Sequence, residues 1–255
     1  MRITFIICVL TTVMYHRVNA QDTTTRNFYR EIKNYDLSFL WISDSIITDT
    51  DIPEPIGFIG DSFQRFFIHF TAVKKNHFNH YIYNVEGKTK VKDLIHAFHG
   101  TITILSSEIG FDTILDDPKV VNSSGIVRCE ILFYEDKKSP GSGKIEGELE
   151  TNFYFDKKNV LRYDSLGLGG MDTYCNNQFR GTWTSYKTLK KKKCNWGDFR
   201  IPESDALDGG VGEFVPEEKY YKRGWDTYQK AFIWDDPNAS QSYKAMKIEE
   251  KQWWK

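Results

Sequence analysis

Residues 178–202 read QFRGTWTSYKTLKKKKCNWGDFRIP, and this stretch decides the expected fold. Apolar and polar residues alternate through its first half, a lysine-rich turn follows, and a second apolar segment leads to the Arg-Ile-Pro exit. Alternation with a period of two, interrupted by a polar turn, predicts strands over residues 179–188 and 196–201 that form a hairpin. The stretch matches no catalytic motif, so we interpret it as a structural element that closes a sheet.

The same alternation continues upstream and predicts a meander. Its clearest example is residues 144–155, where apolar residues fall on one face and charged residues on the other. Polar turns, including a tight turn at residues 86–88, separate similar segments at residues 66–73, 80–85, 89–94, 95–105, 126–135 and 160–164. We therefore expect a mainly β protein of about eight strands, either a curled antiparallel meander or an up-and-down β-barrel, with a short C-terminal helix.

Three glycines recur in one sequence context. Gly100, Gly147 and Gly181 each follow an apolar and a polar residue, and alternation resumes after each. Glycine weakens a strand and is kept where the sheet bends or another segment approaches closely. Repeated bends curl a sheet toward closure, so the three are candidate structural residues; chance recurrence in a glycine-containing β protein is the alternative.

The N-terminus predicts export. Arg2 precedes a short apolar run, and Val18, Asn19 and Ala20 form a signal-peptidase site, so residues 1–20 are interpreted as a signal peptide. A periplasmic or secreted location follows, with no integral membrane segment after cleavage. Residues 21–60 are then an N-terminal arm and lead-in, residues 61–202 the β-domain, and residues 203–255 a loop, a helix at residues 217–232 and a loosely ordered tail.

The net charge restricts the expected partners, and the cysteines bear on the redox state. The chain has 34 basic and 35 acidic side chains, and its net charge of −1 becomes slightly more negative when residues 1–20 are removed. Such a weak overall charge predicts no attraction to nucleic acid or to an anionic membrane. In an oxidising compartment, Cys175 and Cys194 are candidates for a disulfide because they bracket the strand at residues 179–188, whereas Cys129 is expected to be a buried thiol.

Few residues are candidates for chemistry or binding. Cys/His spacings of zinc sites, nucleophile elbows and nucleotide-binding loops are not found, so we predict no metal, cofactor or catalytic residue from motifs. Trp183, Trp196 and Tyr186 are candidates for lining a ligand-binding mouth, and packing in the core is their alternative role. The four lysines at residues 190–193 either protect a strand edge from pairing or dock an acidic partner.

The segment is also similar to a known pattern. FRGTWTSYKT and CNWGDFRIP resemble the FxGTWTSYKT…CNWGDxRIP segment of uncharacterised secreted bacterial β-rich proteins. The resemblance covers about residues 95–202, is specific in the last 25 of them, and implies no activity. The meander is similar in outline to calycin or lipocalin-like barrels, which implies architecture alone.

These observations favour a secreted or envelope-associated binding protein that is not an enzyme. Its expected partner is a small apolar ligand or another protein, held at the mouth of the barrel. The alternative is a glycan-acting hydrolase that uses carboxylates between Asp198 and Glu213, because two facing carboxylates can cleave a glycoside.

Overall fold

The computed structural model describes residues 25–43, 52–111, 117–165, 174–231 and 239–255. Its strands are β1 (Arg26–Asn27), β2 (Ile56–Ile59), β3 (Gln64–Lys75), β4 (Ile82–Val91), β5 (Leu94–Gly110), β6 (Val121–Glu135), β7 (Gly143–Asp156), β8 (Leu161–Tyr163), β9 (Asn176–Ser185) and β10 (Lys191–Asp198). Its helical segments are α1 (Tyr29–Ile32), α2 (Asp226–Ala231) and α3 (Ala239–Glu249), with 3-10 turns η1 (Ser38–Trp41), η3 (Asp205–Leu207) and η4 (Glu218–Arg223). The expected signal peptide lies outside the described residues.

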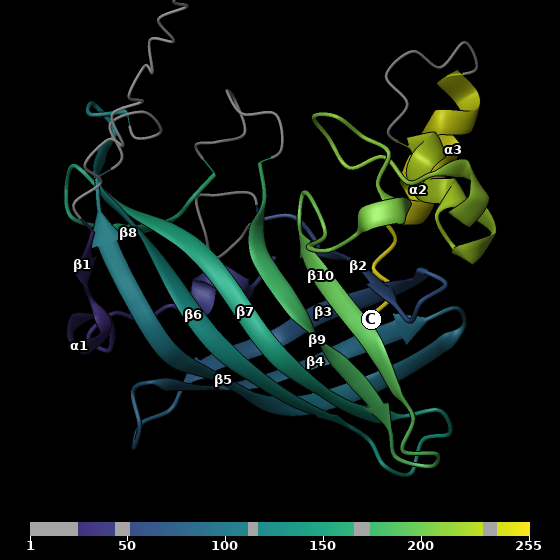
Figure 1. Cartoon of the computed structure of the whole chain (residues 1–255), viewed down its shortest axis with the longest axis horizontal. Helices are drawn as coiled ribbons and strands as arrows, with labels where there is room; N and C mark the ends of the chain where they lie inside the picture. Colours follow the sequence, from purple (N-terminus) through teal and green to yellow (C-terminus); the bar gives the residue numbers. More distant parts are fainter. Residues whose placement is uncertain (1–24, 44–51, 112–116, 166–173, 232–238) are drawn as a thin grey trace, which may run out of the picture.

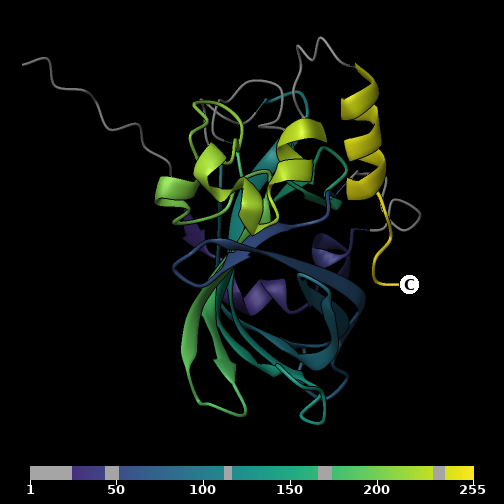
Figure 2. The same cartoon turned by 90° about the vertical axis from the view of Figure 1, so that its right-hand side faces the viewer.

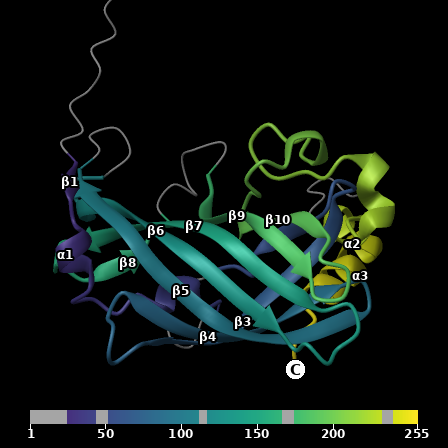
Figure 3. The same ribbon diagram turned by 60° about the horizontal axis from the view of Figure 1, so that its bottom comes forward.

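The strands form one sheet that closes on itself. From β2 onward each strand of the ring pairs with the next, in the order β2, β3, β4, β5, β6, β7, β9 and β10, and β10 pairs back with β2. Every one of these pairings is antiparallel, while β1 and β8 add short pairings to β5 and β7. The prediction of a mainly β, up-and-down antiparallel sheet with a short C-terminal helix is confirmed (Figure 1, Figure 3).

Glycines occupy the closest approaches between strands of the ring. Gly147 of β7 pairs directly with Gly181 of β9. A Cβ added to Gly147 would lie 2.5 Å from Gly181 Cα, and one added to Gly181 would lie 2.2 Å from Phe179 Cζ. Gly100 of β5 is equally crowded, because its Cβ would lie 2.0 Å from Leu132 O. The absent side chains thus leave room for neighbouring backbone and for the Phe179 ring.

One predicted turn does not exist. Strand β4 runs without interruption through residues 86–88, and the chain reverses at Lys92, whose φ is +55°, before β5 begins. Gly87 is not a turn glycine: a Cβ there would lie 2.4 Å from Phe98 Cζ of the paired strand. The Glu-Gly-Lys triplet mimics turn chemistry, but its glycine serves to let an aromatic ring lie over the backbone.

The N-terminal segment fills the ring instead of forming a loose arm. Phe28, Ile32, Leu37, Leu40 and Trp41 are buried. Trp41 donates its indole N–H to Thr151 Oγ1 of β7 at 3.0 Å, and its ring packs edge-on against Tyr83 of β4. Since β4 and β7 lie three places apart in the ring, Trp41 crosses the interior, and Figure 2 shows this segment inside the strands. We call residues 28–41 the plug.

The C-terminal residues pack against the outside of the ring. In place of a loosely ordered tail, residues 239–249 form α3, and Glu249 makes a bidentate pair with Arg65 of β3 at 2.6 and 2.8 Å. Trp254 stacks on His69 of β3 with 3.8 Å between ring centroids. The expected helix at residues 217–232 is divided by Gly224, whose φ is +97°, into η4 and α2.

The disulfide prediction is wrong: Cys129, Cys175 and Cys194 are all free. The strand register explains why, since Cys194 pairs with Gly181 of β9, six residues beyond Cys175. At about 3.4 Å per residue the two cysteines are separated by about 20 Å along the strand, whereas a disulfide needs Cα atoms less than about 7 Å apart. Burial raises the pKa of Cys129 and Cys194, as expected for inert core thiols.

Candidate functional site

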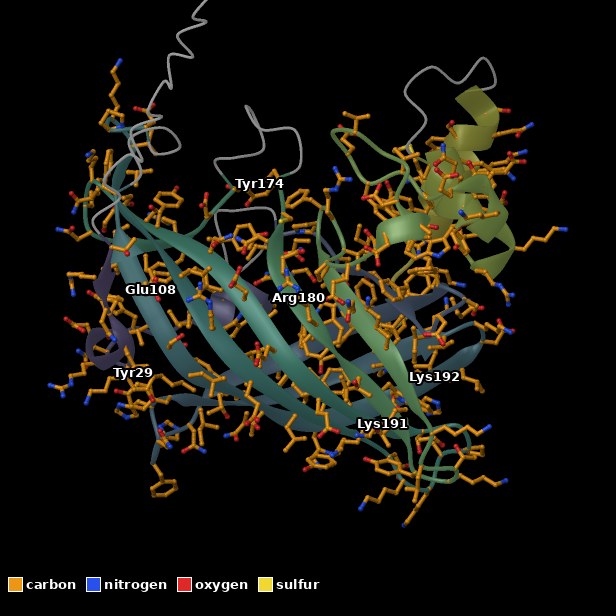
Figure 4. The ribbon with its side chains drawn as sticks, viewed as in Figure 1. Tyr29, Glu108, Tyr174, Arg180, Lys191 and Lys192 are labelled. Carbon is orange, nitrogen blue, oxygen red and sulfur yellow. The ribbon has the colours of Figure 1, made fainter. Side chains whose placement is uncertain are left out.

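Lysines gather at one end of the ring. The turns β2–β3, β4–β5, β6–β7 and β9–β10 all lie at this end, since they join alternate pairs of an up-and-down meander, and the last three carry its lysines. We call residues 92–95, 136–142 and 186–192 the lysine end. Its exposed charges are seven lysines and two aspartates: Lys92, Asp93, Asp136, Lys137, Lys138, Lys187, Lys190, Lys191 and Lys192. Lys191 and Lys192 mark it in Figure 4, away from Tyr29 and Glu108.

Direct contacts join the three turns into one surface. Tyr186 donates its backbone N–H to Ser142 O at 3.2 Å, which ties the β9–β10 turn to the β6–β7 turn. Lys137 Nζ lies 5.4 Å from the centre of the Tyr186 ring, a cation–π contact between the same turns. On the other side, a Cβ on Gly141 would lie 3.4 Å from Leu94 Cδ1 of the β4–β5 turn. The lysines are thus held on a common framework.

A buried glutamate fixes this framework from inside. Glu135 of β6 is only 3% exposed. Its Oε2 accepts hydrogen bonds from the Gly143 backbone N–H at 2.7 Å and from Trp183 Nε1 at 3.0 Å, and its Oε1 accepts one from Thr89 Oγ1 at 2.5 Å. The three donors come from β4, β7 and β9, so one carboxylate connects strands around the ring. A buried carboxylate with three donors is stable where an unpaired one would be costly.

The predicted ligand residues divide between this end and the core. Trp183 and Tyr186 both lie beneath the lysines, and Lys192 Nζ lies 5.4 Å from the centre of the Trp183 ring. Burial raises the pKa of Tyr186, and its hydroxyl is buried without a hydrogen-bond partner among the described residues. Trp196 lies apart from them: it is 1% exposed and stacks on Phe179 with 3.6 Å between the ring centroids. The structure therefore does not bring the three residues into one mouth.

The interior contains a small cavity at the opposite half of the ring. It has a volume of about 10 Å³, room for about one water, and its lining includes Trp41 of the plug, Phe70, Trp196 and Asp198. Asp198 is fully buried, and its Oδ2 accepts hydrogen bonds from the Tyr163 hydroxyl at 2.8 Å and from Asn177 Nδ2 at 2.7 Å. Burial raises the pKa of Asp198 to about 8.

Other carboxylates between Asp198 and Glu213 have structural contacts. Asp208 binds the Arg200 guanidinium at 2.6 Å and accepts backbone N–H bonds from Gly210 and Val215, which shapes the loop after β10. Glu203 is half exposed and pairs with Lys193 at 2.8 Å, which lowers the pKa of Glu203. In these contacts Asp208 and Glu203 organise the exit from β10, while Asp198 is enclosed in the ring.

Comparison with known proteins returned no matching family model, no matching curated protein and no matching solved structure. In the described part of the chain, no group of three or more histidines, cysteines or acids is placed to hold a metal ion. Among the same residues, no helix combines the length and the apolar character needed to cross a bilayer. The proposed function therefore rests on the geometry of the lysine end.

Only part of the lysine end was predictable from the sequence. The run at residues 190–193 was visible, but Lys92, Lys137 and Lys138 are remote in sequence and meet it through the pairing of β5 with β6 and of β7 with β9. Protection of a strand edge also fits Lys191 and Lys192, because β2 pairs with β10 only from Cys194 onward, next to Lys193 O, which accepts a bond from Gly60 N. The hairpin turns were the signal that could have revealed this surface, because every second turn of a meander lies at the same end.

Proposed function

We propose that this protein is an exported, envelope-associated binding protein that acts without catalysis and docks an acidic partner on its lysine end. The observation that carries the proposal is the segregation of charge. Seven exposed lysines and two aspartates lie on three adjoining turns, in a chain whose net charge is −1. A concentrated positive field accelerates encounter with negatively charged partners and orients them, even when the whole molecule is nearly neutral.

The ring has little free space inside, and this supports binding on its outer surface. The plug occupies the ring, and the cavity beside Asp198 has room for about one water. A small apolar ligand, the other partner considered, could enter the interior of the ring only by displacing the plug or core side chains. The N-terminal sequence with its signal-peptidase pattern supports export.

The proposal is tested with poly-L-glutamate as a model acidic partner. The protein without residues 1–20 is immobilised, and binding is followed by interferometry over a range of salt concentrations. We expect binding that weakens steeply with salt, because counterions compete for the lysines. Replacing Lys187, Lys190 and Lys191 together by glutamate should abolish it.

A matched variant controls for net charge. Lys119, Lys157 and Lys158 are exposed on connections at the opposite end of the ring, and their replacement by glutamate changes the net charge equally. This variant should retain most of the binding. Equal losses in the two triple variants, or no binding by the unaltered protein, would refute docking through the lysine end.

A further inference from the structure

Apolar side chains project from the lysine end among the lysines. Leu189 at the tip of the β9–β10 turn is 76% exposed, and Leu94 and Ile95 at the β4–β5 turn are 54% and 46% exposed. Hairpin turns normally carry polar residues or glycine. Three large aliphatic side chains on one small surface therefore indicate a partner that accepts apolar groups.

Leu189 is also held in an unfavourable backbone conformation. Its φ is +57°, in the left-handed region that glycine and asparagine adopt at low cost and that leucine adopts rarely. The exposed side chain gains little from packing to offset this cost. The turn between Lys187 and Lys190 thus keeps a large apolar side chain at a position where glycine or asparagine would cost less.

The combination identifies the chemistry of the partner. Lysine ammonium groups pair with phosphates, and aliphatic side chains at the same level enter the acyl region just below them. An acidic protein surface would match the lysines but would leave leucines at the outermost positions facing charged groups. We infer that the lysine end seats on an anionic lipid surface, with Leu189 inserted below the headgroups. This inference rests on the proposed function and names its acidic partner as phospholipid.

Other exposed apolar groups make the opposite end a suitable control. Phe78, at the β3–β4 turn, is fully exposed and lies at the other end of the ring. Its turn has fewer unengaged lysines, because Lys75 Nζ donates to Lys33 O at 2.6 Å and to Tyr35 O. If exposed apolar area alone caused membrane binding, Phe78 would contribute as much as Leu189.

The experiment measures flotation of the protein, without residues 1–20, with vesicles. Vesicles of equal parts phosphatidylglycerol and phosphatidylcholine should bind it, and vesicles of phosphatidylcholine alone should not. Leu189→Ser should weaken binding to the anionic vesicles about tenfold, the effect of withdrawing one leucine side chain from an apolar phase. Phe78→Ser should leave vesicle binding unchanged. Both variants should bind poly-L-glutamate as the unaltered protein does, and circular dichroism should show that they are folded.

The outcomes separate this inference from the proposed function. Binding to poly-L-glutamate without binding to anionic vesicles would overturn the lipid inference and leave an acidic protein as the partner. Vesicle binding that is unaffected by Leu189→Ser, or equally reduced by Phe78→Ser, would overturn insertion at the lysine end. Failure to bind either probe would overturn the proposed function together with the inference.

Discussion

Gly147 lies directly opposite Gly181 where β7 pairs with β9, and neither position has room for a methyl group. A Cβ on Gly181 would lie 2.2 Å from Phe179 Cζ and 2.5 Å from Glu146 O, one contact being with a buried ring and the other with backbone. Neither neighbour can withdraw easily, because Phe179 is stacked on Trp196 in the core. The pair therefore allows two strands and an aromatic ring to share one narrow space.

Gly181→Val should destabilise the fold strongly. Overpacking a tight core costs about 1–3 kcal/mol or more, and here the backbone of β7 would also have to move. Thermal unfolding followed by circular dichroism should show a large fall in Tm or no cooperative transition. Thr182→Val, at the next position of the same strand, should change Tm little. A normally folded Gly181→Val protein would show that the close approach is not structurally important.

The strands of the ring were predictable because each presents one face to the core and one to water. That requirement imposes a period of two on the sequence, as in β7, where Leu149, Thr151 and Phe153 are buried and the residues between them are not. Turn residues predicted turns less reliably than alternation predicted strands. Gly87 illustrates this, because a glycine permits close packing as readily as it permits a turn.

The plug and the lysine end were not predictable in the same way. The plug has no sequence period, because its burial depends on single contacts such as Trp41 with Thr151 and not on a repeated face. The lysine end depends on which strands pair, because the pairing of β5 with β6 and of β7 with β9 makes the three turns neighbours. Net charge obscured it, since seven lysines at one end are cancelled by acids elsewhere.

The three cysteines that follow residue 20 should behave as independent thiols. In the native protein without residues 1–20, the partly exposed Cys175 should be the only one alkylated by iodoacetamide at neutral pH, since Cys129 and Cys194 are fully buried. Mass spectrometry should detect one adduct before unfolding and three after it. Dithiothreitol should leave Tm unchanged. A lower Tm under reducing conditions would show that a disulfide forms after all.

Asp198 should make the protein less stable as the pH rises. Burial raises the pKa of this carboxyl from 3.8 to about 8, so the folded state binds the proton more tightly than the unfolded chain does. Its contribution is complete below about pH 4 and is lost as the pH rises through about 8. The free energy of unfolding, measured in urea, should therefore fall between pH 5 and pH 8.5.

Asp198→Asn isolates this contribution. The asparagine carbonyl oxygen can accept the bonds from Tyr163 and Asn177, but the side chain cannot ionise. The variant should resemble the unaltered protein at pH 5 and exceed its stability at pH 8.5, by an amount on the order of a few kcal/mol. Other titrating groups affect both proteins equally. Parallel pH profiles would mean that Asp198 ionises normally in the folded state.

The Arg65–Glu249 pair should determine whether α3 stays attached to the ring. Arg65 and Glu249 side chains are 5% and 12% exposed, and the guanidinium also lies 5.1 Å from the centres of the Trp225 and Tyr228 rings. Glu249→Ala leaves a buried cation without its partner, a change that costs about 3–5 kcal/mol. The neighbouring Glu250 offers a matched control, because its pair with Lys247 is exposed and Glu250→Ala should change stability little.

Hydrogen exchange detects the expected detachment, because loss of the pair releases α3 before it unfolds the closed ring. Amides of residues 239–249 should exchange much faster in Glu249→Ala than in Glu250→Ala, while those of β5 and β6 keep their protection. Trp253 and Trp254 follow α3 in the chain and contact β3 through Phe67 and His69, so their fluorescence should report the same release. Equal exchange in the two variants would show that these aromatic contacts hold α3 without the ion pair.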